Sequence, residues 1–168
     1  MPDGKLHFYF DTVALSNFAL VNRLDLLNIL HPDQLFITTE VVDEISAGIS
    51  SGFKPLQGIP DLITDNIFYL HSLSSTERQL YTSLLVNLGA GEASSIAAAK
   101  TAKGIVVTDD KLARNVCRET GMELTGTIGI LKKLCVRDIL QSLDADNILR
   151  EMITHGFYSP IDRISSIL

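Results

Sequence analysis

The chain has 168 residues, of which 46% are apolar and 20% are charged, and its formal net charge at pH 7 is −6. This length suits one domain, and the apolar fraction describes a globular protein with a substantial core and excludes a disordered chain. No uninterrupted apolar run reaches the ~20 residues that a membrane-spanning helix needs, and the first residues lack the pattern of a signal peptide. We therefore expect one cytoplasmic domain over residues 1–168 that makes no membrane contact.

Short apolar runs alternate with helical patterns in the first part of the chain. Residues 6–10 form an apolar, aromatic run that predicts a buried strand, and residues 34–38 predict a second strand. Between these strands, apolar residues from Leu15 to Leu30 recur at helical spacing. We expect Thr39 to cap the next helix, and the glycines and prolines at 48–60 indicate a looser connection.

The same alternation continues in the middle of the chain. Residues 66–70 predict a third strand, and Ser74 followed by Glu77 forms a capping-box pattern ahead of a helix. The Ala-rich segment 92–103 predicts another helix, and residues 104–108 predict a fourth strand.

The remaining residues predict a helix over 110–120, a short strand over 122–126 and further helices, with starts at Asp144 and at the Ser159-Pro160 pair. Strands separated by helices require crossover connections, which build a parallel sheet covered on both faces. The sequence therefore predicts an α/β fold, a single-domain α/β/α sandwich of about five parallel strands. A C-terminal helical extension is expected over about 137–168.

Acidic side chains fall where these strands end. Asp11 follows the first strand, and Asp109 and Asp110 follow the fourth. Glu44 lies on the helix after the second strand, and Glu92 lies in the first turn of the helix that leads to the fourth. Ligands of open parallel sheets bind beyond the carboxyl ends of the strands, so these carboxylates are directed toward one edge.

Each of these acids has an ordinary structural explanation when it is considered alone. Such a residue can cap a helix, interact with the helix dipole or lie on a solvated helix face. Convergent carboxylates, however, raise one another's pKa unless a cation neutralises them. Because oxygen ligands favour hard divalent ions, the set predicts a magnesium or manganese site.

Basic residues are concentrated near the acidic pair. Between residues 100 and 137, Lys or Arg stands at eight positions and Asp or Glu at four, and Lys111 and Arg114 directly follow Asp110. A basic surface beside an acidic point suits a polyanion held next to a cation, although a solvated helix face is the simpler explanation of the bases alone. The cysteines form no CxxC pair and the histidines show no ligand spacing, so no zinc site is expected.

Two other classes of α/β protein fit less well. A receiver-type phospho-acceptor domain needs an Asp at the end of a central strand, where the second strand has Thr38-Thr39. A glycine fingerprint for nucleotides must follow a strand, whereas the GAGEAS stretch at 89–94 follows a Leu-rich helix.

Three motifs resemble those of a known family. Gly91-Glu92 opens a helix, DDKLAR occupies residues 109–114, and GTIGIL occupies residues 126–131. Together with the Asp-Thr pair at 11–12, they resemble the PIN domain, the nuclease fold of many VapC-type toxins of toxin–antitoxin systems. The resemblance runs from Phe8 to about the C-terminus.

The resemblance implies a Mg²⁺- or Mn²⁺-dependent ribonuclease that hydrolyses RNA phosphodiester bonds, and a cognate antitoxin protein as its partner. It leaves a homodimer open, and the alternative is a catalytically silent PIN-like protein with a binding or regulatory role. The implied catalytic and metal-binding residues are Asp11, Glu44, Glu92, Asp109 and Asp110. The candidate substrate contacts are Thr12, Lys111 and Arg114.

Three positions depart from the family pattern or leave it open. Val13 stands where a small hydroxyl residue is frequent, and Glu92 stands where many members have Asp. The T-x-D spacing points to Asp110 as the inward acid of the pair, whereas the DDxxAR pattern makes Asp109 equally arguable. On the T-x-D spacing we expect Asp110 to face the cleft and Asp109 to cap the following helix.

Overall fold

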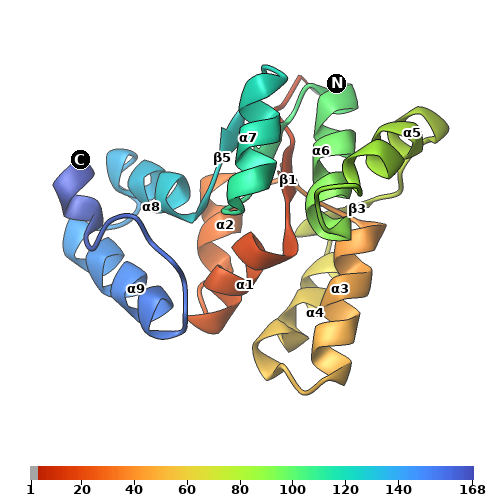
Figure 1. Ribbon diagram of the computed structural model, residues 1–168. Helices are drawn as coiled ribbons and strands as arrows, with labels where there is room; N and C mark the ends of the chain where they lie inside the picture. Colours follow the sequence, from red (N-terminus) through yellow and green to blue (C-terminus); the bar gives the residue numbers. More distant parts are fainter. Residues whose placement is uncertain (1–3) are drawn as a thin grey trace.

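The fold is built on a five-stranded sheet in which all strands are parallel and follow the order β3-β2-β1-β4-β5 (Figure 1). The computed structural model describes residues 4–168. The strands are β1 (Phe8–Phe10), β2 (Leu35–Thr38), β3 (Phe68–His71), β4 (Ile105–Val107) and β5 (Leu124–Thr125). The predicted parallel sheet of about five strands is thereby confirmed.

Helices connect the strands and cover both faces of the sheet. The described residues form the α-helices α1 (Thr12–Leu20), α2 (Asp25–Leu30), α3 (Thr39–Ser50), α4 (Ile59–Thr64), α5 (Ser75–Leu84), α6 (Ala90–Ala102), α7 (Lys111–Glu119), α8 (Thr127–Val136) and α9 (Ser142–Thr154), and the short 3-10 helices η1 (Lys54–Gly58) and η2 (Ile164–Ile167). The predicted α/β/α arrangement with extra C-terminal helices is confirmed. Within residues 4–168, no helix has both the length and the apolar character needed to cross a bilayer.

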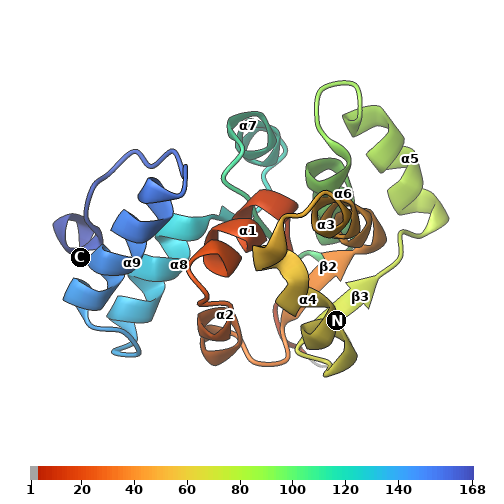
Figure 2. The ribbon, with the colours of Figure 1, turned by 90° about the horizontal axis from the view of Figure 1, so that it is seen from below.

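Side chains of the central strand β1 point alternately to the two faces of the sheet, as strand geometry requires. Phe8 and Phe10 are buried in a core with residues of α1, α2, α8 and α9. Tyr9 is buried in a second core with residues of α6 and α7. Figure 2 shows α9 and α5 at opposite sides of the molecule. Burial on both faces explains why the strands are short, nearly continuous apolar runs.

Three details of the first half differ from the predictions. The single helix expected over 15–30 is two helices, because Asn22 adopts a positive φ of 54° that ends the regular helix between them. The cap of α3 is Thr38 and not Thr39, because the Thr38 hydroxyl accepts from the amide of Val41. The connection at 48–60 contains η1 and the start of α4 rather than an irregular loop.

Of the three helix starts predicted in the second half, one is confirmed, one is displaced by two residues and one is wrong. The capping box of Ser74 and Glu77 is present at the start of α5 and is confirmed. Helix α9 begins two residues before Asp144, which lies in its first turn. The Ser159-Pro160 pair starts no helix, because the Ser159 hydroxyl is bonded to the backbone amide and carbonyl of the second residue after it.

Candidate active site

Asp11 lies at the carboxyl end of β1 and caps α1. Its Oδ1 accepts from the amide of Ala14 at 2.7 Å, and its Oδ2 accepts from the hydroxyl of Thr108 at the end of β4. The side chain is fully buried, at 0% exposure. Two strand ends are thus joined through one carboxylate.

Burial of this carboxylate raises the pKa of Asp11 to about 7, because the charged form loses its hydration. Hydrogen bonds from Thr108 and Ala14 lower the pKa, and the negative charges of Asp109 and Glu92 raise it in smaller part. The charged form of Asp11 is therefore disfavoured unless positive charge is supplied nearby.

The two adjacent acids after β4 have different partners. Asp110 caps α7, since its Oδ1 accepts from the amide of Ala113 at 2.8 Å. The prediction that Asp109 would cap this helix is wrong. Asp109 instead accepts from the amide of Thr127 at 2.9 Å, the first residue of α8. The capping role fell to Asp110 because the chain enters α7 one residue later than expected.

Asp109 is enclosed by hydrogen-bond donors from distant segments. Its Oδ2 accepts from the hydroxyl of Thr127 at 2.5 Å and from the side-chain amide of Asn17 at 3.1 Å. A Cβ on Gly126 would lie 2.5 Å from Asp109 Oδ1, so this glycine is required for the close approach. Both oxygens of Asp109 are engaged by protein donors, and this carboxylate links α1, β4 and α8.

Glu44 on α3 accepts hydrogen bonds at the start of α6 and of α1. Its Oε1 accepts from the amide of Gly91 at 2.8 Å, and its Oε2 accepts from the hydroxyl of Thr12. A Cβ on Gly91 would lie 2.5 Å from Glu44 Oε2, which explains the glycine of the Gly91-Glu92 motif. Burial is the largest cause of the raised pKa of Glu92, and the negative charges of Glu44 and Asp110 raise this pKa further.

A cavity of about 520 Å³ opens at this edge of the sheet. The carboxylates of Glu92, Asp109 and Asp110 line it together with Lys111. Residues 155–158, from the loop after α9, complete the wall. Asp11 is buried near these acids, and the charges of Asp109 and Glu92 raise its pKa. Acids from segments distant in the sequence therefore surround one open space.

A family model described as PIN domain matches residues 8–168. The chain belongs to the PIN-domain family. Members of this family are generally nucleases, and the match agrees with the resemblance of the motifs at the level of the family. No curated protein matches the chain.

The acids of this PIN domain are all oxygen donors, which suits a hard divalent cation. Among residues 4–168, no three acidic, histidine or cysteine side chains are grouped closely enough to enclose a metal by themselves. Magnesium commonly keeps several waters and binds through one or two carboxylates. The donor set therefore fits a magnesium or manganese ion that completes its coordination with water.

The candidate substrate contacts have separate positions. Lys111 is exposed and lines the cavity. Arg114 lines an adjoining cavity, where its Nη1 donates to the carbonyl of Thr108 at 2.8 Å. The hydroxyl of Thr12 is engaged with Glu44. Lys111 and Arg114 are thus placed beside the acids, whereas Thr12 positions one of them.

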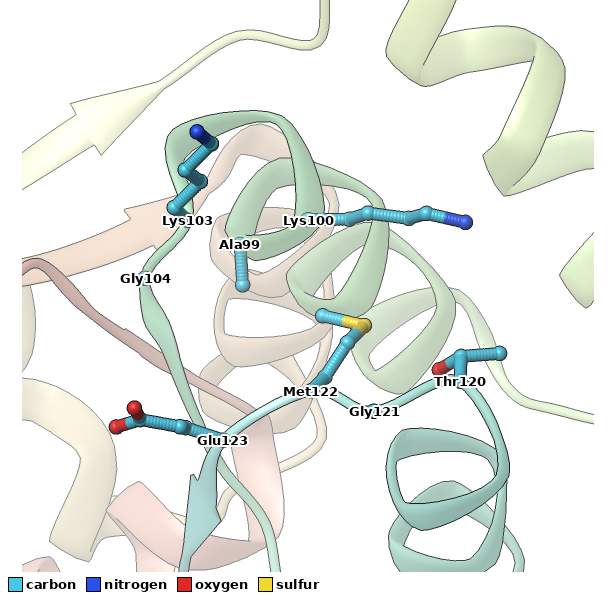
Figure 3. Close-up of a pocket in the computed structure, with 8 residues that line it drawn as sticks. All are labelled: Ala99, Lys100, Lys103, Gly104, Thr120, Gly121, Met122 and Glu123. Carbon is cyan, nitrogen blue, oxygen red and sulfur yellow. The ribbon is translucent and has the colours of Figure 1, made fainter.

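Another cavity lies at the opposite edge of the sheet, before β4 and β5 (Figure 3). Lys100 and Lys103 line it, but their side chains point in different directions, and Glu123 is its one carboxylate among the lining residues drawn. The amino ends of parallel strands are not where such folds bind ligands. This cavity is therefore separate from the acidic site.

Sequence reasoning missed two kinds of residue in the acidic site. Asn17 is buried and donates to Asp109 and to the Thr127 hydroxyl. A polar residue among the buried positions of a helix must find a partner, and this signal was present in the sequence. Residues 155–158 offered no such signal, because only the packing of α9 brings their loop to the cavity.

Proposed function

We propose that this PIN domain is a metal-dependent ribonuclease that hydrolyses RNA phosphodiester bonds. The observation that carries the proposal is the convergence of Glu92, Asp109 and Asp110 on one open cavity above the buried Asp11. Such a cluster of charge is costly without a cation. Lys111 at the rim of the same cavity supplies positive charge for a polyanionic substrate.

In this proposal Asp11, Glu92 and Asp110 hold the Mg²⁺ or Mn²⁺ ion. Asp109 and Glu44 keep their protein partners and set the positions of the elements that carry the ligands. A bound divalent ion supplies an activated water at neutral pH and polarises the phosphate. Lys111 and Arg114 bind the phosphate oxygens and offset the charge that grows on them.

The proposal is tested by incubating the purified protein with a labelled single-stranded RNA and with DNA of the same sequence. We expect RNA cleavage in millimolar Mg²⁺ or Mn²⁺, none in EDTA, and recovery when excess metal is restored. Binding of RNA without cleavage in any of these metals would contradict the proposal and favour the silent, RNA-binding alternative.

We further propose that the chain is the toxin of a toxin–antitoxin pair of the VapC type and acts on RNA in the cytoplasm. The open acidic cavity supports this role, because an Arg- or Lys-bearing segment of an antitoxin could neutralise its carboxylates in place of the metal. Induced expression of the chain alone should arrest growth, and Asp11→Asn should relieve the arrest. Normal growth despite RNase activity of the purified protein would contradict the toxin role.

A further inference from the structure

Tyr158 is the most exposed large side chain near the acidic site. It is 93% exposed, although it belongs to a loop whose backbone is held in place. The amide of Phe157 donates to the carbonyl of Met152 at 3.0 Å, and the amide of Gly156 donates to the carbonyl of Ile153 at 3.0 Å. The phenol ring is therefore presented to solvent by an ordered turn.

This ring stands where two cavities meet. Tyr158 and Phe157 line the cavity of about 520 Å³ that holds the acids, and they also line an adjoining cavity of about 300 Å³. Asp109 and Lys111 are likewise shared by both cavities. The two spaces form one surface that runs from the carboxylates to the C-terminal loop.

The chemistry of this surface changes along its length. Near the acids, Val13 and Leu20 give the wall an apolar part. In the adjoining cavity, Arg114 provides a guanidinium that is fixed by its bond to the Thr108 carbonyl. Lys111 and Tyr158 each line both cavities. Cationic groups and an exposed aromatic ring thus line the same surface.

We propose that Tyr158 is a stacking platform for a nucleobase of single-stranded RNA next to the bond that is cut, with Lys111 and Arg114 holding the adjoining phosphate. This inference rests on the proposed ribonuclease function. Unpaired bases stack on aromatic rings while cations follow the backbone, and this pairing of contacts is what the surface offers. Tyr158 would then position the substrate without touching the reacting atoms.

The natural chain contains no tryptophan, so Tyr158→Trp provides a single fluorophore at the proposed platform. In an Asp11→Asn background, which keeps the RNA intact, we expect single-stranded RNA in Mg²⁺ to quench this tryptophan. The same oligomer without bases should quench it far less. The control is Tyr69→Trp on the edge strand β3, which lines neither of the two cavities and should not respond.

Kinetics provide the second arm of the test. Tyr158→Ala should raise the KM for RNA between roughly 5-fold and 150-fold, the range expected for loss of one base stack, and change kcat little. Tyr158→Phe keeps the ring and should behave as the wild type.

The outcomes separate this inference from the proposed function. The platform would be overturned if the wild type cleaves RNA, RNA does not quench the Tyr158→Trp fluorescence, and Tyr158→Ala leaves the KM unchanged. This result would leave a protein segment as the occupant of this surface. Failure of the wild type to cleave RNA would refute the ribonuclease, while quenching by bases would still establish the platform.

Discussion

Asp11→Asn is expected to abolish RNA cleavage while making the metal-free protein more stable at and above neutral pH. The activity loss should reach orders of magnitude, because the substitution removes the buried charge that attracts the cation. The fold should tolerate the change. The asparagine oxygen can still accept from the amide of Ala14, and its NH₂ group can donate to Thr108, whose hydroxyl then acts as the acceptor.

The gain in stability follows from the pKa of Asp11, which rises from 3.8 in the unfolded chain to about 7 in the folded one. A carboxyl with a raised folded pKa contributes stability that is fully present below pH 3.8 and is lost as the pH rises through 7. Asparagine does not titrate in this range. The stability difference between variant and wild type should therefore grow from pH 4 to pH 7 and level off at about 4 kcal/mol at most.

Thermal melts in EDTA at a series of pH values test this expectation. The control is Asp61→Asn on α4, which removes an exposed charge that lines neither cavity and does not act on the pKa of Asp11, and which should leave the pH dependence unchanged. Adding Mn²⁺ at pH 7.5 should stabilise the wild type by about 2–3 kcal/mol at a hundredfold excess over its Kd. The variant should gain much less. A variant less stable than the wild type at pH 8, or one that keeps wild-type activity, would contradict this role of Asp11.

Asp110→Asn is expected to lose far more activity than stability, and Asp109→Asn to lose more stability than activity. Asp110 uses Oδ1 to cap α7 and lines the cavity beside Glu92, whose pKa its charge raises. Asparagine caps a helix about as well as aspartate, so Asp110→Asn should keep its melting temperature. The loss of a ligand charge should lower the cleavage rate by orders of magnitude.

Asp109→Asn removes one acceptor from a buried network. The new NH₂ group would face the side-chain amide of Asn17 or the hydroxyl of Thr127, which now donate to Asp109. An unsatisfied or mismatched buried polar group costs about 1–3 kcal/mol. Asp109→Asn should therefore melt earlier and keep much of its activity below the new melting temperature.

Initial rates and melting temperatures of the two variants, measured side by side, check this ranking. Asp110→Ser is a matched control, because serine also caps a helix but supplies no carboxylate. It should be as inactive as Asp110→Asn and nearly as stable as the wild type. Equal and severe rate losses for Asp109→Asn and Asp110→Asn, with unchanged melting of both, would show that Asp109 also holds the cation.

The sequence by itself determined the layered fold and the edge of the sheet where the acids lie. Buried parallel strands must be short apolar runs, and crossover helices must separate them, so the order of strands and helices was readable along the chain. The placement of Asp11 and of the Asp109-Asp110 pair followed from the same rule, because Asp11 comes directly after β1 and the pair comes within three residues of the end of β4. These are local properties of consecutive residues.

Only the tertiary structure decided what each acid contacts. Asn17 reaches Asp109 across 92 residues and Thr127 across 110 residues, and no local pattern encodes such pairs. The same holds for Glu44, which meets the amide of Gly91 only because α3 packs against α6. Tyr158 reaches the acidic cavity because α9 packs against α1 and α8. A hydrogen bond tolerates changes of only a few tenths of an ångström in the donor–acceptor distance. The packing of distant elements sets that distance.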